Sequence, residues 1–309
     1  MMYHDKNDTI FNYSKFLIFM NTAVITTGGL GTRMLTFTKS NPKTMLPVYT
    51  KSKDASLTPM FKPLIEYIFE NLYDCGFRRF CFIVGAKTKS SIINHMEPDA
   101  KFIKLLQSRN LPEDKRFINS LLKLYTKIKS CDIKWITQDT PSGFGDALLG
   151  AKNFVKNETF LLHAGDTYFP NYQFLKKFIS MHENSENVSG SILVKKMNKL
   201  KGYGIAQTKK QKSENIVINL EEKPKKPKSN QAMLPLYVFK SEIFTALKNT
   251  DIGYNKELQV TDAIMTLVNN QKKILSYNYG ASKWFDIGRP SHYFNALTYS
   301  YKQSLIKKR

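Results

Sequence analysis

The chain has 309 residues, of which 42% are hydrophobic and 13% aromatic, a composition typical of a folded globular protein and not of a disordered one. Its sequence holds no apolar run near the ~18 residues of a membrane-spanning helix, which excludes a membrane protein of that kind. Lys and Arg total 47 against 25 Asp and Glu, and the net charge of +22 suits an anionic partner.

The distribution of the basic residues and of the cysteines excludes further classes of protein. The basic residues are mostly lysines in short, separate groups without aromatic partners, so we expect phosphorylated small molecules and no nucleic acid as partners. Cys75, Cys81 and Cys131 cannot all pair and show no CxxC spacing, which excludes a disulfide scaffold or a cysteine-ligated zinc site and favours the cytoplasm. Residues 1–20 lack the pattern of a secretory signal, and we expect them to be an N-terminal extension.

The first half of the chain alternates strand and helix patterns. Residues 22–27 are β-branched and apolar and end at glycines, which predicts a buried strand. Continuous apolar runs predict further strands over 80–84, 133–137 and 159–163, and apolar residues at helical spacing predict helices over 64–72 and 118–128. This alternation predicts an α/β fold, with a doubly wound, mostly parallel sheet covered by helices on both faces.

After about residue 190 the pattern becomes mainly that of strands. We expect strands over 191–195, 204–207, 216–220, 233–239 and 274–277, and helices over 241–248 and 261–270. The sequence therefore predicts a smaller, more antiparallel part that packs on the first.

A glycine-rich segment follows the first predicted strand and contains Gly28, Gly29, Leu30, Gly31, Thr32 and Arg33. Glycines after a strand let the backbone approach a ligand closely, and successive N–H groups can bind phosphate oxygens. The spacing matches neither a P-loop, which needs GxxxxGK[ST], nor a dinucleotide fingerprint, whose third glycine is replaced by Met34. Arg33 and Lys43 flank the segment, and two cations of different geometry suit a triphosphate.

The segment GGLGTRMLTFTKSNPKTMLP, residues 28–47, resembles the signature of the sugar-1-phosphate nucleotidyltransferases, especially the bacterial-type UTP–glucose-1-phosphate uridylyltransferases. Five more segments resemble family motifs in the same order: Lys62–Ile65 with Tyr67, Gln138–Gly145, Gly165-Asp166, Glu221–Pro224 and Trp284–Gly288. Each segment alone could be an ordinary turn or loop, but their occurrence in the family's order favours a functional role for them.

The resemblance implies a Rossmann-like nucleotidyltransferase fold over residues 21–295. Its nucleotide-binding part would span about 21–190 and its sugar-binding part about 191–295, followed by a basic C-terminal tail over 296–309. Residues 51–61 form an insertion that is longer than the usual link in the family.

The resemblance further implies a metal-assisted reaction of UTP with glucose 1-phosphate to give UDP-glucose and pyrophosphate. Arg33, Lys43 and Lys223 would be catalytic, and Asp166 and Asp286 would hold Mg²⁺. The nucleotide would bind at Gly28, Gly29, Leu30, Gly31, Thr32, Gln138, Pro141 and Gly143, and the sugar at Gly204, Glu222 and Lys223. Gln138 could present both a donor and an acceptor to a pyrimidine.

Two alternatives stay open within this resemblance. One is a glucose-1-phosphate thymidylyltransferase, because the segments from Glu221 to Tyr237 and Trp284–Asp286 resemble that branch. The other is a non-catalytic regulatory subunit that binds a sugar nucleotide, against which the retained basic and acidic motif residues argue. We also expect a homo-oligomer.

Overall fold

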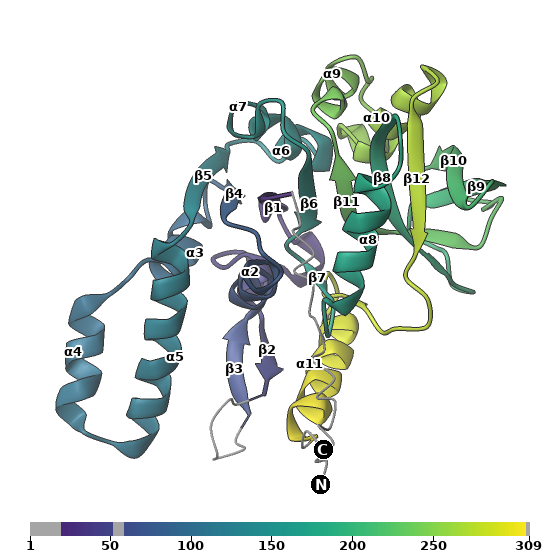
Figure 1. Ribbon diagram of the computed structural model, residues 1–309. Coiled ribbons are helices and arrows are strands. Elements are labelled where there is room, and N and C mark those ends of the chain that lie inside the picture. The colour runs from purple at the N-terminus through teal and green to yellow at the C-terminus, as the bar shows by residue number, and fades with distance from the viewer. Residues whose placement is uncertain (1–19, 52–58, 307–309) are drawn as a thin grey trace, which may run out of the picture.

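Four parallel strands form one half of the main sheet, in the spatial order β5 (Asp132–Gln138), β4 (Arg79–Gly85), β1 (Thr22–Thr26) and β6 (Phe160–Ala164). The computed structural model describes residues 20–51 and 59–306, so the expected extension lies outside the described residues except for Met20. The predicted doubly wound α/β sheet is confirmed in this half (Figure 1).

The second half continues the same sheet. β11 (Gln231–Phe239) lies antiparallel to β6, and beyond it follow β8 (Val188–Lys196), β12 (Lys273–Asn278), β10 (Glu214–Glu221) and β9 (Ile205–Gln211). β8 and β12 are parallel, whereas β10 and β9 pair antiparallel with their neighbours. The predicted strands of this part are therefore present, but they extend one nine-stranded sheet.

Helices cover both faces of the sheet because its strands alternate their side chains between two cores. On β1, Ala23 and Ile25 face one core while Val24 faces the other. The first core contains residues of α2 (Leu64–Asp74), α5 (Pro112–Lys129), α8 (Gln173–Glu183) and α11 (Pro290–Leu305). The second contains residues of α6 (Phe144–Gly150), α7 (Lys152–Val155), α9 (Glu242–Lys248) and α10 (Val260–Asn269).

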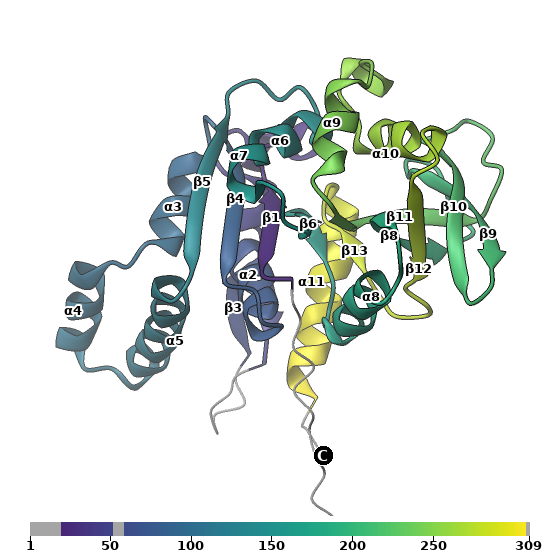
Figure 2. The same cartoon turned by 45° about the horizontal axis from the view of Figure 1, so that its top comes forward.

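Between β4 and β5 the chain forms a helical excursion at one side of the molecule (Figures 1 and 2). It consists of α3 (Lys89–Met96), α4 (Ala100–Arg109) and α5, and the helix predicted over residues 118–128 is the C-terminal part of α5. The Asp99 side chain caps α4 by accepting a hydrogen bond of 2.9 Å from the Phe102 backbone N–H.

Two further features lie outside the main sheet. β2 (Pro47–Thr50) and β3 (Met60–Pro63) form a hairpin around the expected insertion, whose residues 52–58 lie outside the described residues. α11 packs along β2, where the Ser300 hydroxyl accepts a bond of 3.1 Å from the Tyr49 backbone N–H. The boundary expected at residue 295 falls inside α11, which continues to Leu305. Within the described part of the chain, no helix is both long and apolar enough to cross a membrane.

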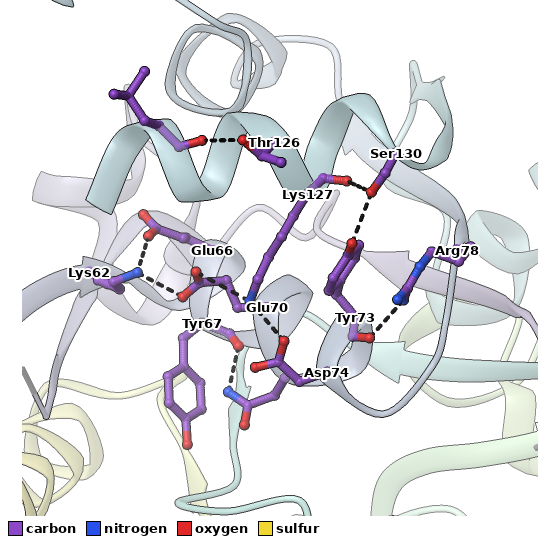
Figure 3. A network of polar contacts seen from close by, with 12 residues as sticks. Lys62, Glu66, Tyr67, Glu70, Tyr73, Asp74, Arg78, Thr126, Lys127 and Ser130 are labelled. Atoms are coloured by element: carbon purple, nitrogen blue, oxygen red, sulfur yellow. Dashed lines mark hydrogen bonds and ion pairs between the residues drawn. The ribbon is translucent and has the colours of Figure 1, made fainter. Parts of the chain in front are cut away.

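A buried network of ion pairs connects β3 and the helical excursion to α2 (Figure 3). The Lys62 ammonium lies 2.6 Å from a carboxylate oxygen of Glu66 and 2.7 Å from one of Glu70. The second Glu66 oxygen lies 2.8 Å from His95 Nε2, and Lys127 on α5 lies 3.6 Å from Glu70. Burial disfavours the charged form of Lys62, but the two carboxylates outweigh it and raise the Lys62 pKa.

Candidate active site

The candidate site lies at the carboxyl edge of the parallel strands, where ligands bind in open α/β sheets. The glycine-rich segment follows β1, Gly85 ends β4, Gln138 ends β5 and Asp166 follows β6. Since these strands are parallel, the topology brings four segments far apart in the sequence to one edge.

Acidic and basic residues converge at the end of β6. Lys43, in the short helix η2 (Lys43–Met45), forms an ion pair and hydrogen bond with Asp166. β7 (Thr167–Tyr168) pairs with β13 (Phe285–Asp286), so that Asp286 lies opposite Thr167. The Ile287 backbone N–H also donates to the Asp166 carbonyl at 3.0 Å. The structure thus brings Asp166 and Asp286 together although 120 residues separate them in the sequence.

Arg33 completes this group from η1 (Thr32–Met34). A Cβ atom on Gly288 would lie 2.8 Å from an Arg33 guanidinium nitrogen and 2.8 Å from Asp286 Oδ1, so the glycine makes room for both side chains. Burial of Asp166 favours its neutral form, but the charge of Lys43 and, more weakly, that of Arg33 outweigh burial and lower the Asp166 pKa. The local field therefore favours anions at this edge of the sheet.

The glycine-rich segment is anchored at its far end. Gly31 has a φ of +62°, and a Cβ there would lie 2.7 Å from Thr38 Cγ2. The Thr38 hydroxyl donates to the Gly31 carbonyl at 2.9 Å. Gly29, Leu30 and Thr32 are exposed, so their backbone is accessible to a ligand.

Gln138 lies against the start of the glycine-rich segment, and its amide oxygen lies 2.5 Å from the position of a Cβ on Gly28. Its Nε2 group donates to the Gly143 carbonyl at 3.2 Å and to Asp146 Oδ2 at 2.7 Å. In the structure both amide hydrogens of Gln138 are used within the protein, so its amide oxygen is the atom left to interact with a ligand.

The neighbouring loop has a structural role as well. Gly143 has a φ of +121°, and a Cβ there would lie 2.6 Å from the Leu258 carbonyl oxygen. The Leu258 N–H donates to the Ser142 carbonyl at 2.9 Å. The glycine is therefore required by the approach of this loop to Leu258, while Pro141 is exposed at its tip.

A second cluster contains the residues expected to bind the sugar. One Glu222 oxygen accepts a 2.6 Å hydrogen bond from the Thr261 hydroxyl, and the other lies 2.9 Å from the Lys223 ammonium. A Cβ on Gly204 would lie 3.2 Å from Glu222 Oε2, so Gly204 leaves space beside this carboxylate. Lys223 also lies 4.8 Å from the centre of the Tyr254 ring.

Tyr203 connects the two clusters, since it directly precedes Gly204 and its ring lies 5.7 Å from that of Trp284. Burial raises the pKa of Tyr203 and the charge of Asp286 raises it further, whereas the charges of Arg289 and Arg33 act in the opposite direction. Tyr203, Thr261 and Asp146 were not predicted from the sequence. Tyr203 and Thr261 contact residues of distant segments, Trp284 and Glu222, whereas Asp146 lies directly after the Gln138–Gly145 segment and carries no signal of its own.

Known proteins are similar to this chain in sequence and in fold. The model of the family described as nucleotidyl transferase matches residues 22–303. The UTP–glucose-1-phosphate uridylyltransferase of Mycoplasma pneumoniae is 31% identical over 284 residues, which cover 90% of this chain and 91% of that protein. The enzyme of the same name from Bacillus subtilis is 32% identical over 275 residues, 86% of each chain.

Solved structures show the same fold. The crystal structure of apo UDP-glucose pyrophosphorylase has a TM-score of 0.78 at 24% identity and covers 92% of this chain and 99% of that one. UTP-bound UGPase from Acinetobacter baumannii has a TM-score of 0.72 at 23% identity, covering 94% and 100%.

Proposed function

The chain belongs to the nucleotidyl transferase family, and we propose that it transfers the uridylyl group of UTP to glucose 1-phosphate, forming UDP-glucose and pyrophosphate. The observation that carries this proposal is the convergence of Arg33, Lys43, Asp166 and Asp286 beside the glycine-rich segment. The names of the relatives with about 31% identity support the choice of substrates.

In this reaction an oxygen of the sugar phosphate forms a bond to the α-phosphorus of UTP. The bond from that phosphorus to the oxygen bridging the α- and β-phosphates breaks, and pyrophosphate leaves with the electron pair. Both reactants are anions, so the main task of the protein is to align them and to offset their charge. Arg33 and Lys43 would hold the triphosphate, and Lys223 would hold the sugar phosphate.

Asp166 and Asp286 have the chemistry to hold Mg²⁺, which prefers oxygen ligands and commonly takes one or two carboxylates from the protein. Among the described residues, no group of three or more His, Cys, Asp and Glu side chains is arranged to hold a metal ion by itself, so substrate oxygens and water would complete the coordination. When bound, Mg²⁺ would offset negative charge on the reacting phosphates. Lys43 would then exchange its ion pair with Asp166 for a contact with phosphate.

The sugar would bind at the second cluster, with its hydroxyls donating to Glu222. Thr261 and Lys223 already hold this carboxylate from both sides, which supports a fixed acceptor. We further propose a homo-oligomer in the cytoplasm, where the three free cysteines would stay reduced.

The test is pyrophosphate release measured with UTP, dTTP, CTP, ATP and GTP, each against glucose 1-phosphate and other sugar 1-phosphates. We expect the highest kcat/KM for UTP with glucose 1-phosphate. A higher value for dTTP would assign the chain to the thymidylyltransferases. Binding of sugar nucleotides without pyrophosphate release from any pair would indicate a regulatory subunit.

A further inference from the structure

We propose that Asp146 determines the choice of base by fixing the amide of Gln138 so that only its oxygen faces the nucleotide. This inference rests on the proposed function, since it concerns the nucleotide of the same site. It starts from a side chain that belongs to neither cluster of charged residues.

The hydrogen bonds of Gln138 leave it one way to act on a ligand. A glutamine amide has two N–H hydrogens, and Nε2 of Gln138 donates to Asp146 Oδ2 at 2.7 Å and to the Gly143 carbonyl at 3.2 Å. Both partners are acceptors, so a flipped amide would place its oxygen against two oxygens. The carboxylate of Asp146 therefore fixes the amide in this orientation.

The amide oxygen of Gln138 faces the glycine-rich segment. Gln138 Oε1 lies 2.5 Å from the position of a Cβ on Gly28, which is the first residue of the glycine-rich segment. Gln138 ends β5, Gly85 ends β4, and a Cβ on Gly85 would lie 3.3 Å from the Gly28 carbonyl oxygen, so the three residues share one edge. An acceptor thus lies beside the glycine-rich segment, at which the nucleotide is proposed to bind.

An acceptor in this place distinguishes the pyrimidines. Uracil and thymine carry an N–H at ring position 3, which can donate to Gln138 Oε1. Cytosine carries a lone pair at the same position, and two facing acceptors repel each other. A polar group left unpaired in a site costs much of the binding energy, so the fixed amide favours UTP over CTP.

Asp146→Asn tests the proposal, because an asparagine can accept from Nε2 or donate to Oε1, so that only the 3.2 Å bond to the Gly143 carbonyl still favours the present orientation of Gln138. Asp146→Ala removes the partner altogether. Asp132→Asn is the matched control. Asp132 begins β5, the strand that ends at Gln138, and its side chain is 59% exposed. The measurements are kcat/KM for UTP and CTP with glucose 1-phosphate, and calorimetric binding of each nucleotide with Mg²⁺.

We expect the ratio of UTP to CTP, in kcat/KM and in affinity, to fall by about tenfold or more in both Asp146 variants. The ratio should stay at its wild-type value in Asp132→Asn. Wild-type ratios in both Asp146 variants would overturn the inference. If the wild-type protein released no pyrophosphate from UTP and glucose 1-phosphate, the proposed function would fail, while the calorimetric ratio would still decide the role of Asp146.

Discussion

Replacing Lys62 by methionine should destabilise the protein strongly, because it leaves a buried carboxylate without its cation. Lys62 is 9% exposed and Glu66 4% exposed, and the two groups lie 2.6 Å apart. Removing one partner of a buried ion pair costs about 3–5 kcal/mol, since the other charge stays desolvated. We expect the free energy of unfolding at pH 7.5 to fall by about this amount and the Tm by about 6–10 °C.

Lys127→Met is the matched control, because it makes the same change in the same network nearer to solvent (Figure 3). Lys127 pairs with Asp74 at 2.9 Å, and the Asp74 side chain is 55% exposed. A pair with one exposed partner contributes about 1 kcal/mol, so this variant should lose much less stability in urea than Lys62→Met. Equal losses in the two variants, or a Lys62→Met protein as stable as the wild type, would refute the reasoning.

The pH dependence of this deficit gives a second check. Burial favours neutral Glu66, but its hydrogen bond with His95 and the charge of Lys62 together lower its pKa below the ordinary 4.5. In the wild type, the stabilisation that comes from ionised Glu66 is fully present above pH 4.5. It is lost as the pH falls through the lowered pKa of Glu66 in the folded protein. Without Lys62 the pKa of Glu66 rises, so Glu66 of the folded variant takes up a proton as the pH falls. The deficit should therefore be largest near pH 7–8 and narrow below about pH 5.

Three further outcomes are expected. Asp166→Asn and Asp286→Asn should each lower kcat at least ~10²-fold without loss of folding, and EDTA should abolish activity that Mg²⁺ restores; full turnover without metal would contradict the proposed metal site. Thr261→Val should raise KM for glucose 1-phosphate about tenfold and leave KM for UTP unchanged, with Thr261→Ser near the wild type, because the hydroxyl bond to Glu222 is lost only in the valine variant. Deleting residues 1–19 should change neither kcat nor Tm, and a large fall in either would show that this segment packs on the fold.

The strands and the charged centre were predictable because their signals are local or follow from topology. Apolar runs marked β1, β4 and β6, and because β1 and β6 are parallel, the segments that follow them lie at the same edge of the sheet. The partner of Asp286 could be inferred only through the family resemblance, since the β7–β13 pairing has no pattern of its own in two-residue strands.

The C-terminal helix escaped prediction for a physical reason. α11 buries Ala296, Ser300 and Ser304, which recur at four-residue spacing but are small and mostly polar. Of its larger apolar residues, Phe294 and Leu305 are exposed, and Tyr293 and Tyr299 are only partly buried. A search for large apolar residues at helical spacing therefore misses the packed face, and the basic end of the chain suggested a tail.

The orientation of Gln138 was equally hidden from the sequence. Glutamine carries a donor and an acceptor, and only the hydrogen bonds to Gly143 and Asp146 show which one remains available. The requirement for Gly143 likewise depends on Leu258, more than a hundred residues away in the chain.

β11 has a mechanical consequence for the whole molecule. One of its edges is hydrogen-bonded to β6, which leads to Asp166, and the other to β8, with an additional pairing to β9 near the sugar cluster. A hinge between the nucleotide and sugar halves would have to break this shared strand and divide a core that takes residues from both halves, including Val24 and Ile264. The two halves therefore form one rigid unit. Any movement that encloses the substrates must come from loops at the carboxyl edge of the sheet.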